Sequence, residues 1–466
     1  MKAPNLIKSE NFLASIEAEH YANKQKIATG DLKTPSHIVN SDILIQLEKL
    51  KKATPKEARA IKFSDHSVGY GTSLHQVKKI LLEKGIDEKH IVENQLFGMD
   101  IDPDKVLATR LVIDPNRKYN NNIIVGDSRT MSFETKGITH SWNNEPYLKG
   151  DGGKTPVYGE IIENVDKQNP VQQSESHLLP FGISLSDSLR PLLNNFFSKG
   201  LEHWRGWGID SFEGAKVRTV SYICNKGYNG KIKMWYDNNF LFEYDFRRLG
   251  YIINGGTAGL TDLLVNVRNQ NKSNPMYVSQ SIHFDKIKAT DDDVKKEKFK
   301  DSVPILIRNR NAEFDMKKDV GYVHKSKISS KDLDKPKMVF GYRPNGGEYG
   351  THSFCTINVI PKGVAVLSKD QYQAFDTIQQ ANNRKQYLHS GPIENFFLKR
   401  SRTQPTIDAR KPRNTQKMYF NQLSFIDNVD PTIIFKNNDA IIDYFSKKYN
   451  LSKQVRNELA NESSIK

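Results

Sequence analysis

Three aspartates follow segments that the sequence predicts to be buried strands. Asp65 opens the turn Asp65-x-x-x-Gly69-x-Gly71, while Asp100 and Asp127 each follow a later apolar run. Ligands of open α/β sheets bind at the carboxyl ends of the strands, so these acids predict a binding edge. The glycines let the backbone approach a ligand closely, and N–H groups at a following helix start favour anionic groups. Each acid alone is equally typical of a helix cap or a turn.

The chemistry of these acids indicates what the ligand carries. The turn at Asp65 lacks the third glycine of the dinucleotide fingerprint and opens with an acid, which suits an amino group better than a pyrophosphate. Asp100 is placed to accept from both hydroxyls of a ribose. S-adenosylmethionine offers an ammonium, a ribose and an adenine, and it needs acceptors for all three. We therefore expect this cofactor.

Strand and helix patterns alternate in the part of the chain that carries these acids. The predicted strands are 60–64, 95–101 and 122–126, and the predicted helices are 36–52, 74–81 and 104–111. This rhythm is typical of a parallel, doubly wound α/β sheet. Further along we expect helices at 157–165, 187–197 and 439–459, and antiparallel strands at 216–225 and 230–236 joined by the turn 226–229.

Composition limits the class of protein. The chain has 466 residues, enough for two or three domains, with a net charge of +15, 37% hydrophobic residues and 10% aromatic residues. No apolar run is long enough for a membrane span and no secretory signal is evident, so we expect a cytoplasmic protein without a membrane partner. Cys224 and Cys355 are the only cysteines, which excludes a disulfide framework and a Cys-rich zinc site, and we expect no metal. Basic excess with many aromatics suits a nucleic acid.

The tetrapeptide Asn144-Glu145-Pro146-Tyr147 resembles the catalytic Asn-Pro-Pro-Tyr motif of S-adenosylmethionine-dependent N6-adenine DNA methyltransferases. The motif order resembles the group in which cofactor motifs come first and target recognition last. The segments 212–214 and 448–451 resemble methylases of type II restriction–modification systems. The resemblance covers most of the chain and implies a Rossmann-like methyltransferase domain, with a mostly parallel doubly wound sheet, followed by an α+β target-recognition domain.

The resemblance also implies roles for single residues. Thr34 and Pro35 resemble the motif that closes over the methionine moiety. The cofactor loop is matched by Asp65, Gly69 and Gly71, the ribose-binding acid by Asp100 and the adenine-reading residue by Asp127. His66 stands where the family usually has proline.

The catalytic motif suits a weakly nucleophilic amine, because the lone pair of the adenine amino group is delocalised into the ring. The Asn144 side-chain oxygen and the main-chain carbonyl of residue 145 can accept from both of its N–H groups and free the lone pair for attack on a sulfonium methyl. The base must first leave the duplex, and Tyr147 offers a ring on which it can stack. No metal is required.

Glu145 departs from the family, which has proline at this place. Three interpretations stay open. The chain is an active adenine methyltransferase with a looser loop; it methylates another nucleic-acid amine; or it is a catalytically degenerate relative that binds DNA without methylating it.

We expect a methyltransferase domain at 1–285, a charged linker or surface excursion at 286–337, and a target-recognition and C-terminal helical region at 338–466. The predicted partner is double-stranded DNA, and any restriction endonuclease would be a separate chain. The candidate DNA-contacting residues are Tyr222, Arg343, Lys399, Arg400, Arg402, Arg410, Lys411 and Arg413. For the basic stretch 391–417, which holds the last six of these residues, a solvated charged face is an almost equally good interpretation.

Overall fold

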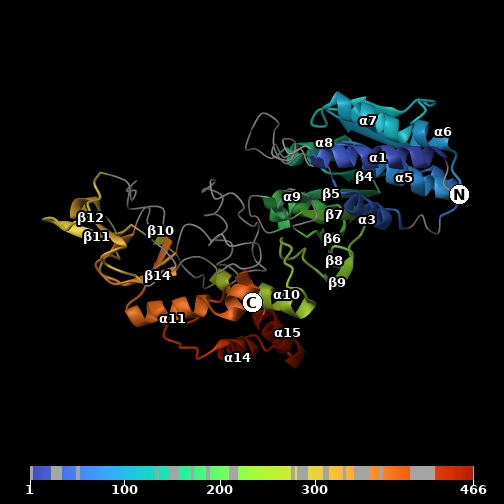
Figure 1. Ribbon diagram of the computed structural model, residues 1–466. Helices are drawn as coiled ribbons and strands as arrows, with labels where there is room; N and C mark the ends of the chain where they lie inside the picture. Colours follow the sequence, from blue (N-terminus) through green and yellow to red (C-terminus); the bar gives the residue numbers. More distant parts are fainter. Residues whose placement is uncertain are drawn as a thin grey trace. The chain divides into compact units, whose positions relative to one another are not determined.

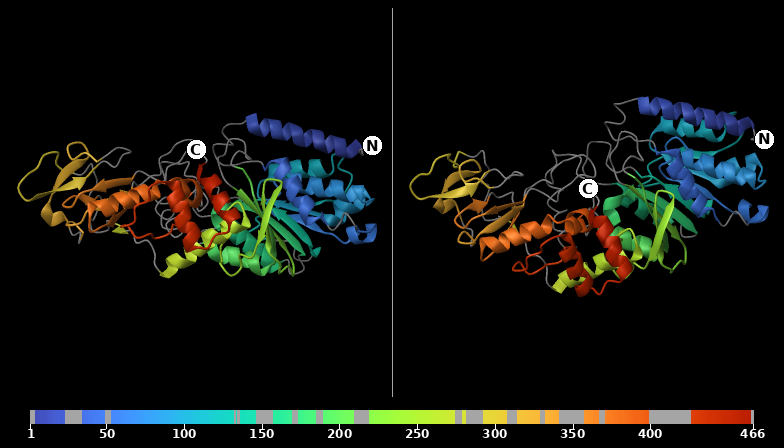
Figure 2. Two further views of the ribbon diagram at one scale, coloured as in Figure 1. Left: turned by 90° about the horizontal axis from the view of Figure 1, so that it is seen from below. Right: turned by 60° about the horizontal axis from the view of Figure 1, so that its bottom comes forward.

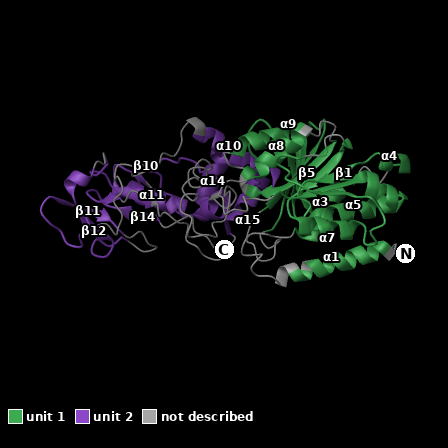
Figure 3. Cartoon of the chain, turned by 90° about the horizontal axis from the view of Figure 1, so that it is seen from above, with its two compact units in different colours: residues 1–252 green, residues 253–466 purple. Residues whose placement is uncertain are grey.

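The computed structural model divides the chain into two compact units, residues 1–252 and 253–466 (Figure 3). The described residues are 4–22, 34–48, 53–131, 133, 136–145, 157–168, 173–184, 189–208, 219–273, 279–280, 292–307, 314–328, 332–340, 357–366, 371–398 and 426–464. The units divide earlier in the chain than the boundary at 285 that we expected.

The first unit is built on a nine-stranded sheet of order β3-β2-β1-β4-β5-β7-β6-β8-β9 (Figure 1). The strands are β1 (Phe63–Asp65), β2 (Leu96–Asp100), β3 (Asn122–Val125), β4 (His140–Asn143), β5 (Ser174–Pro180), β6 (Leu201–Gly206), β7 (Thr219–Asn225), β8 (Ile232–Tyr236) and β9 (Asn239–Tyr244). Strands β1 to β5 pair in parallel, whereas β7 is antiparallel to both of its neighbours. The expected α/β class with a large, mostly parallel sheet is confirmed.

Helices cover both faces of this sheet. Figure 3 shows α3 (Ser36–Gln46), α5 (Thr72–Glu83) and α7 (Pro103–Ile113) on one face, and α8 (Tyr158–Gln168) and α9 (Arg190–Ser198) on the other. Helix α1 (Pro4–Ala22) packs on α5 and α7 from outside (Figure 2). Shorter helical segments are α4 (Pro55–Arg59), α6 (Glu88–His90), η2 (Ile91–Gln95) and η4 (Phe181–Ser184).

One predicted pairing is wrong. Strands β7 and β8 do form within the segments 216–225 and 230–236, but they are not paired as a hairpin, because β6 lies between them. Strand β6 pairs antiparallel with β7 and parallel with β8, and β8 turns back into β9. Alternation of apolar residues identifies a strand, but it says nothing about which strand is its neighbour. The largely buried β6 takes the inner position and leaves the half-exposed β8 and β9 outside.

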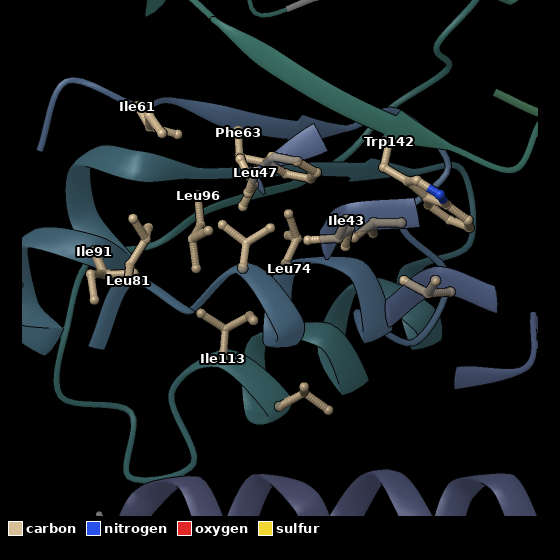
Figure 4. Packing of buried hydrophobic residues seen from close by; sticks show 14 of the residues in the cluster. Ile43, Leu47, Ile61, Phe63, Leu74, Leu81, Ile91, Leu96, Ile113 and Trp142 are labelled. Carbon is tan, nitrogen blue, oxygen red and sulfur yellow. The ribbon is translucent and has the colours of Figure 1, made fainter. Parts of the chain in front are cut away.

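The core of the first unit lies between the sheet and the layer of α3, α5 and α7 (Figure 4). Phe63 of β1 and Leu96 of β2 pack there against Leu74 of α5 and Ile113 of α7, and all four side chains are buried. Trp142 of β4 closes the core beside α3. These contacts fix the strands whose carboxyl ends carry the predicted acids.

The second unit contains two small sheets and a helical part. Its helices are α10 (Ala258–Ser273), α11 (Ile378–Leu388), η7 (Lys325–Lys327), η8 (Pro392–Leu398), α14 (Asn438–Lys448) and α15 (Lys453–Ser464). Its strands are β10 (Ser279–Gln280), β11 (Ser302–Leu306), β12 (Val320–His324), β13 (Lys337–Phe340), β14 (Ile357–Ile360), β15 (Ala365–Val366) and β16 (Gln371–Ala374). The sheets have the orders β10-β16-β13-β14 and β12-β11-β15. The single helix expected at 439–459 is two helices in the structure, α14 and α15, separated by residues 449–452.

Part of the region 286–337, which we expected to be a charged linker or surface excursion, forms strands. It contributes β11 and β12, which pair antiparallel, and β11 also pairs with β15. The buried side chains of Ile305 and Val323 pack with Ala365 beneath the charged surface. We did not predict these strands, because the many lysines of the region outweigh its short apolar alternation. In the described part of the chain, no helix combines the length and apolarity that a bilayer crossing requires.

The packing predicts different costs for two leucines at helix α3. Leu47 is 3% exposed and belongs to the core, whereas Leu44 is 46% exposed. Leu47→Ala should lower the free energy of unfolding by about 2–5 kcal/mol because it leaves a cavity. Leu44→Ala, the matched control, should change it by less than about 1 kcal/mol. Urea unfolding of both variants measures the difference, and equal losses would contradict this packing.

Candidate functional site

The loops that follow β1 and β2 are joined by main-chain hydrogen bonds. Gly69 N donates to Asp100 Oδ2 at 2.9 Å, and Val68 N donates to Met99 O at 2.9 Å. The second carboxylate oxygen of Asp100 accepts from Asp102 N at 3.0 Å. Asp100 thus holds the glycine-containing loop against the end of β2, which brings two of the predicted cofactor motifs together.

Gly71 occupies a place that only glycine fits. Its φ is +79°, and a Cβ there would lie 2.9 Å from Thr109 Cγ2. Gly69 also has a positive φ, +53°, and its carbonyl accepts from Thr109 Oγ1 at 2.8 Å. Helix α7 therefore presses the loop into a tight path just before α5 begins at Thr72.

Asp65 lies inside this loop. It is 1% exposed, Ser67 N donates to its Oδ1 at 3.0 Å, and the hydroxyl of Ser73 donates to its Oδ2. Burial raises the pKa of Asp65 to about 7, against the lowering effect of these hydrogen bonds. We expected this acid to face an amino group of the ligand, but here one oxygen accepts from the loop and the other from Ser73 at the start of α5.

Asp127 lies after β3, next to Asp100. Gly126 N donates to the main-chain carbonyl of Asp100 at 3.0 Å, and the hydroxyl of Ser128 donates to the carbonyl of His66. Hydrogen bonds from Arg129, the shortest 2.5 Å, lower the pKa of the Asp127 carboxyl. The carboxyl ends of β1, β2 and β3 are thereby tied to one another.

A cavity of about 390 Å³ opens beside Asp127. The loop after β3 and helix α8 line it with Asp127, Arg129, Thr130, Glu160, Glu163, Asn164 and Lys167. Its walls are polar and carry both signs of charge.

The end of β4 joins the same group of loops. Asn143 is buried, and its Oδ1 accepts from His66 N at 2.9 Å. Asn144 Nδ2 donates to Thr34 Oγ1 at 2.6 Å, so two residues 110 positions apart meet where α3 begins. Pro35 is the N-cap residue of α3. Pro146 and Tyr147 lie outside the described residues.

Glu145 turns inward from the end of β4. Its Oε1 lies 2.5 Å from Nδ1 of His177 on β5, and both side chains are buried. Burial alone would lower the pKa of His177, but the negative charges of Glu145 and Glu175 and the hydrogen bond to Glu145 raise it to about 10. His177 is therefore a cation at neutral pH, and Nδ1–H donates to Glu145. The carboxylate that replaces the family's proline is therefore paired with His177 inside the sheet.

The structure corrects the DNA contact predicted at Tyr222. The ring is fully buried, it stacks on Phe196 at 5.1 Å between centroids, and its hydroxyl pairs with Ser184 at 2.7 Å. A ring without exposed surface cannot stack on a base, so Tyr222 is a core residue. The other DNA-contact candidates, Arg343, Lys399, Arg400, Arg402, Arg410, Lys411 and Arg413, lie outside the described residues.

Two residues at this site were not found by sequence reasoning. His177 sits on a strand with no motif of its own, and only the strand pairing brings it to Glu145. Ile101 is 66% exposed directly after Asp100, which gives the edge of the site an apolar face. Among the described residues, no group of three or more His, Cys, Asp or Glu is arranged to hold a metal ion.

Comparisons with known proteins give distant structural likeness. No protein-family model matches the chain, and no curated protein matches it in sequence. A modification subunit of a putative type I restriction enzyme from Vibrio vulnificus is 13% identical, with a TM-score of 0.38, over 58% of this chain and 58% of that one. The type IIG restriction endonuclease BpuSI is 12% identical, with a TM-score of 0.41, over 93% of this chain and 66% of that one.

A type I restriction–modification methyltransferase subunit from Streptococcus thermophilus is 12% identical, with a TM-score of 0.33, over 44% of this chain. The match spans 47% of that subunit, and 58% of the Vibrio vulnificus subunit. The chain therefore aligns with about half the length of these type I subunits.

The raised pKa of Asp65 predicts how stability depends on pH. Between pH 4 and pH 7 the folded state keeps a proton that the unfolded state has released, so rising pH destabilises the protein. Asp65→Asn cannot titrate. Its free energy of unfolding relative to wild type should rise from pH 5 to pH 7, by at most about 1.4 kcal/mol per pH unit.

Urea unfolding at both pH values measures this change. Asp87→Asn is the matched control, because Asp87 is exposed and its helix-start hydrogen bond lowers its pKa, so it is ionised throughout this range in both states. An Asp65→Asn difference that stays as flat as the control would contradict the assignment.

Proposed function

We propose that this chain is an S-adenosylmethionine-dependent methyltransferase that methylates adenine N6 in double-stranded DNA after base flipping. One observation carries the proposal. The loops after β1, β2, β3 and β4 are hydrogen-bonded into a single edge that holds the predicted cofactor residues beside Asn144. This is the edge at which open α/β sheets bind ligands.

The residues present fit the cofactor at several points. Asp100 and the exposed Ile101 offer an acceptor for ribose hydroxyls and an apolar face for a flat ring. The tight path at Gly71 keeps side chains away from the ligand, and Thr34 meets the catalytic loop. Asp127 lines a cavity together with Arg129 and residues of α8. When bound, S-adenosylmethionine supplies a sulfonium methyl group, and Asp65 supports the loop from beneath.

The catalytic work falls to the main chain and side chain at the end of β4. The side-chain nitrogen of Asn144 donates to Thr34, so the side-chain oxygen of Asn144 is the atom left to accept from an amine. The carbonyl of residue 145 is the second acceptor. Together they can orient an exocyclic amine, which is catalysis by positioning and charge stabilisation. We propose that the basic stretch 391–417 contacts the DNA. Any restriction endonuclease that acts with this chain would be a separate protein.

Glu145 bears on the alternative of a degenerate, DNA-binding relative. A carboxylate that replaced proline by drift would be left unpaired or exposed, because burial of a lone charge is costly. Instead it is buried against His177. This pairing favours the active enzyme.

Methyl transfer tests the proposal directly. Purified chain, incubated with unmodified duplex DNA and S-adenosylmethionine labelled in the methyl group, should place the label in N6-methyladenine after digestion to nucleosides. Label in another nucleoside would support a different amine as substrate. DNA binding without any transfer would support the degenerate relative.

Asn144→Ala should abolish transfer, with a loss of about 100-fold or more, because it removes an acceptor used in the transition state. Titration with S-adenosylmethionine should show affinity within about threefold of wild type, since the cofactor edge is unchanged. Asn120→Ala is the matched control on an exposed loop, and it should leave both quantities unchanged. Full activity of Asn144→Ala would contradict the assigned role.

A further inference from the structure

We propose that Glu145 and His177 are positioning residues. They fix Asn144 and the main chain of residue 145, in place of the proline that the family carries at residue 145. The inference rests on the proposed function. A proline ring restricts the backbone covalently, whereas this chain restrains the same residue by anchoring its side chain in the sheet.

The anchor is short and fully enclosed. Glu145 Oε1 and His177 Nδ1 are 2.5 Å apart, and neither side chain has exposed surface. His177 lies on β5 directly opposite Asn143, two residues before Glu145. The restraint therefore acts on the residue whose carbonyl is the proposed second acceptor, and next to Asn144.

His177 is itself held by a line of alternating charges. Its Nε2 lies 3.8 Å from Glu175 Oε2, and Lys199 Nζ at the end of α9 lies 2.8 Å from Glu175 Oε1. Lys199 also pairs with Asp166 of α8. The His177 ring stacks on Phe196 at 5.4 Å between centroids. Three elements, β5, α8 and α9, thus set the place to which Glu145 is tied.

The pair is interdependent, because removing His177 leaves Glu145 as an unpaired buried charge, and removing Glu145 leaves the His177 cation only the longer contact with Glu175, at 3.8 Å. Glu145→Pro alone would restore the family motif, but the His177 cation would lose its hydrogen-bond partner and lie between Glu175 and the ring of Phe196. His177→Leu alone would leave Glu145 without its partner and remove the restraint on residue 145. Only the double variant Glu145→Pro/His177→Leu supplies a rigid backbone and leaves no unpaired charge at 145 or 177, since Glu175 keeps its ion pair with Lys199.

Comparison of these three variants with wild type tests the proposal. Each single variant should lower kcat for methyl transfer about tenfold or more, with KM for S-adenosylmethionine changed less than about threefold. The double variant should recover kcat to within about threefold of wild type, which a merely additive pair would not do. Lys78→Met is the control, since Lys78 also forms a buried ion pair, with Glu88 on the helical layer, and its loss should lower stability but not kcat.

Hydrogen exchange separates failure of this inference from failure of the proposed function, because it needs no activity. Exchange of the amides of residues 143–145 should be faster in His177→Leu than in wild type, and slow again in the double variant. If wild type transfers no methyl group, the proposed function fails while this readout still decides the anchoring. If the other variants fail to fold, Glu145→Gln replaces them, because it keeps the shape of the side chain but removes its charge. It should also speed the exchange of the amides of residues 143–145. Unchanged exchange and kcat in the folded single variants, or no rescue in the double, would overturn the proposal.

Discussion

The site depends on one constraint: four parallel strands end at the same edge of a sheet, and the polar groups of their loops must satisfy one another. Buried N–H and carbonyl groups without partners are costly, so the loops after β1 to β4 are hydrogen-bonded together. Gly69 N meets Asp100, His66 N meets Asn143, and the Ser128 hydroxyl meets the His66 carbonyl. This mutual satisfaction turns four separate motifs into one rigid edge.

Two buried acidic side chains, Asp65 and Glu145, lie at the same edge of the sheet. Asp65 is held inside the loop with a raised pKa, and Glu145 is held inside the sheet by the His177 cation. In sequence, Asp65 looked like a group that faces a ligand. In the structure, both Asp65 and Glu145 are buried, and their carboxylates accept from neighbouring groups of the protein.

Local patterns predicted much of this architecture. Strands, helices and the edge with Asp65, Asp100 and Asp127 follow from apolar periodicity and from the rule that parallel strands share a carboxyl edge. The insertion of β6 between β7 and β8, the burial of Tyr222 and the partner of Glu145 could not be predicted, because each depends on strand neighbours far apart in the chain. The domain roles and the basic stretch stay predictions.

If this edge is a single cofactor site, a crystal structure of the chain with S-adenosylhomocysteine should show where the ligand binds. We expect ligand density between the loop at Gly69–Gly71, the carboxylate of Asp100 and the loop at Asp127, with Asn144 bordering it. Density elsewhere on the chain, or an edge whose loops have separated and hold no ligand, would contradict this expectation.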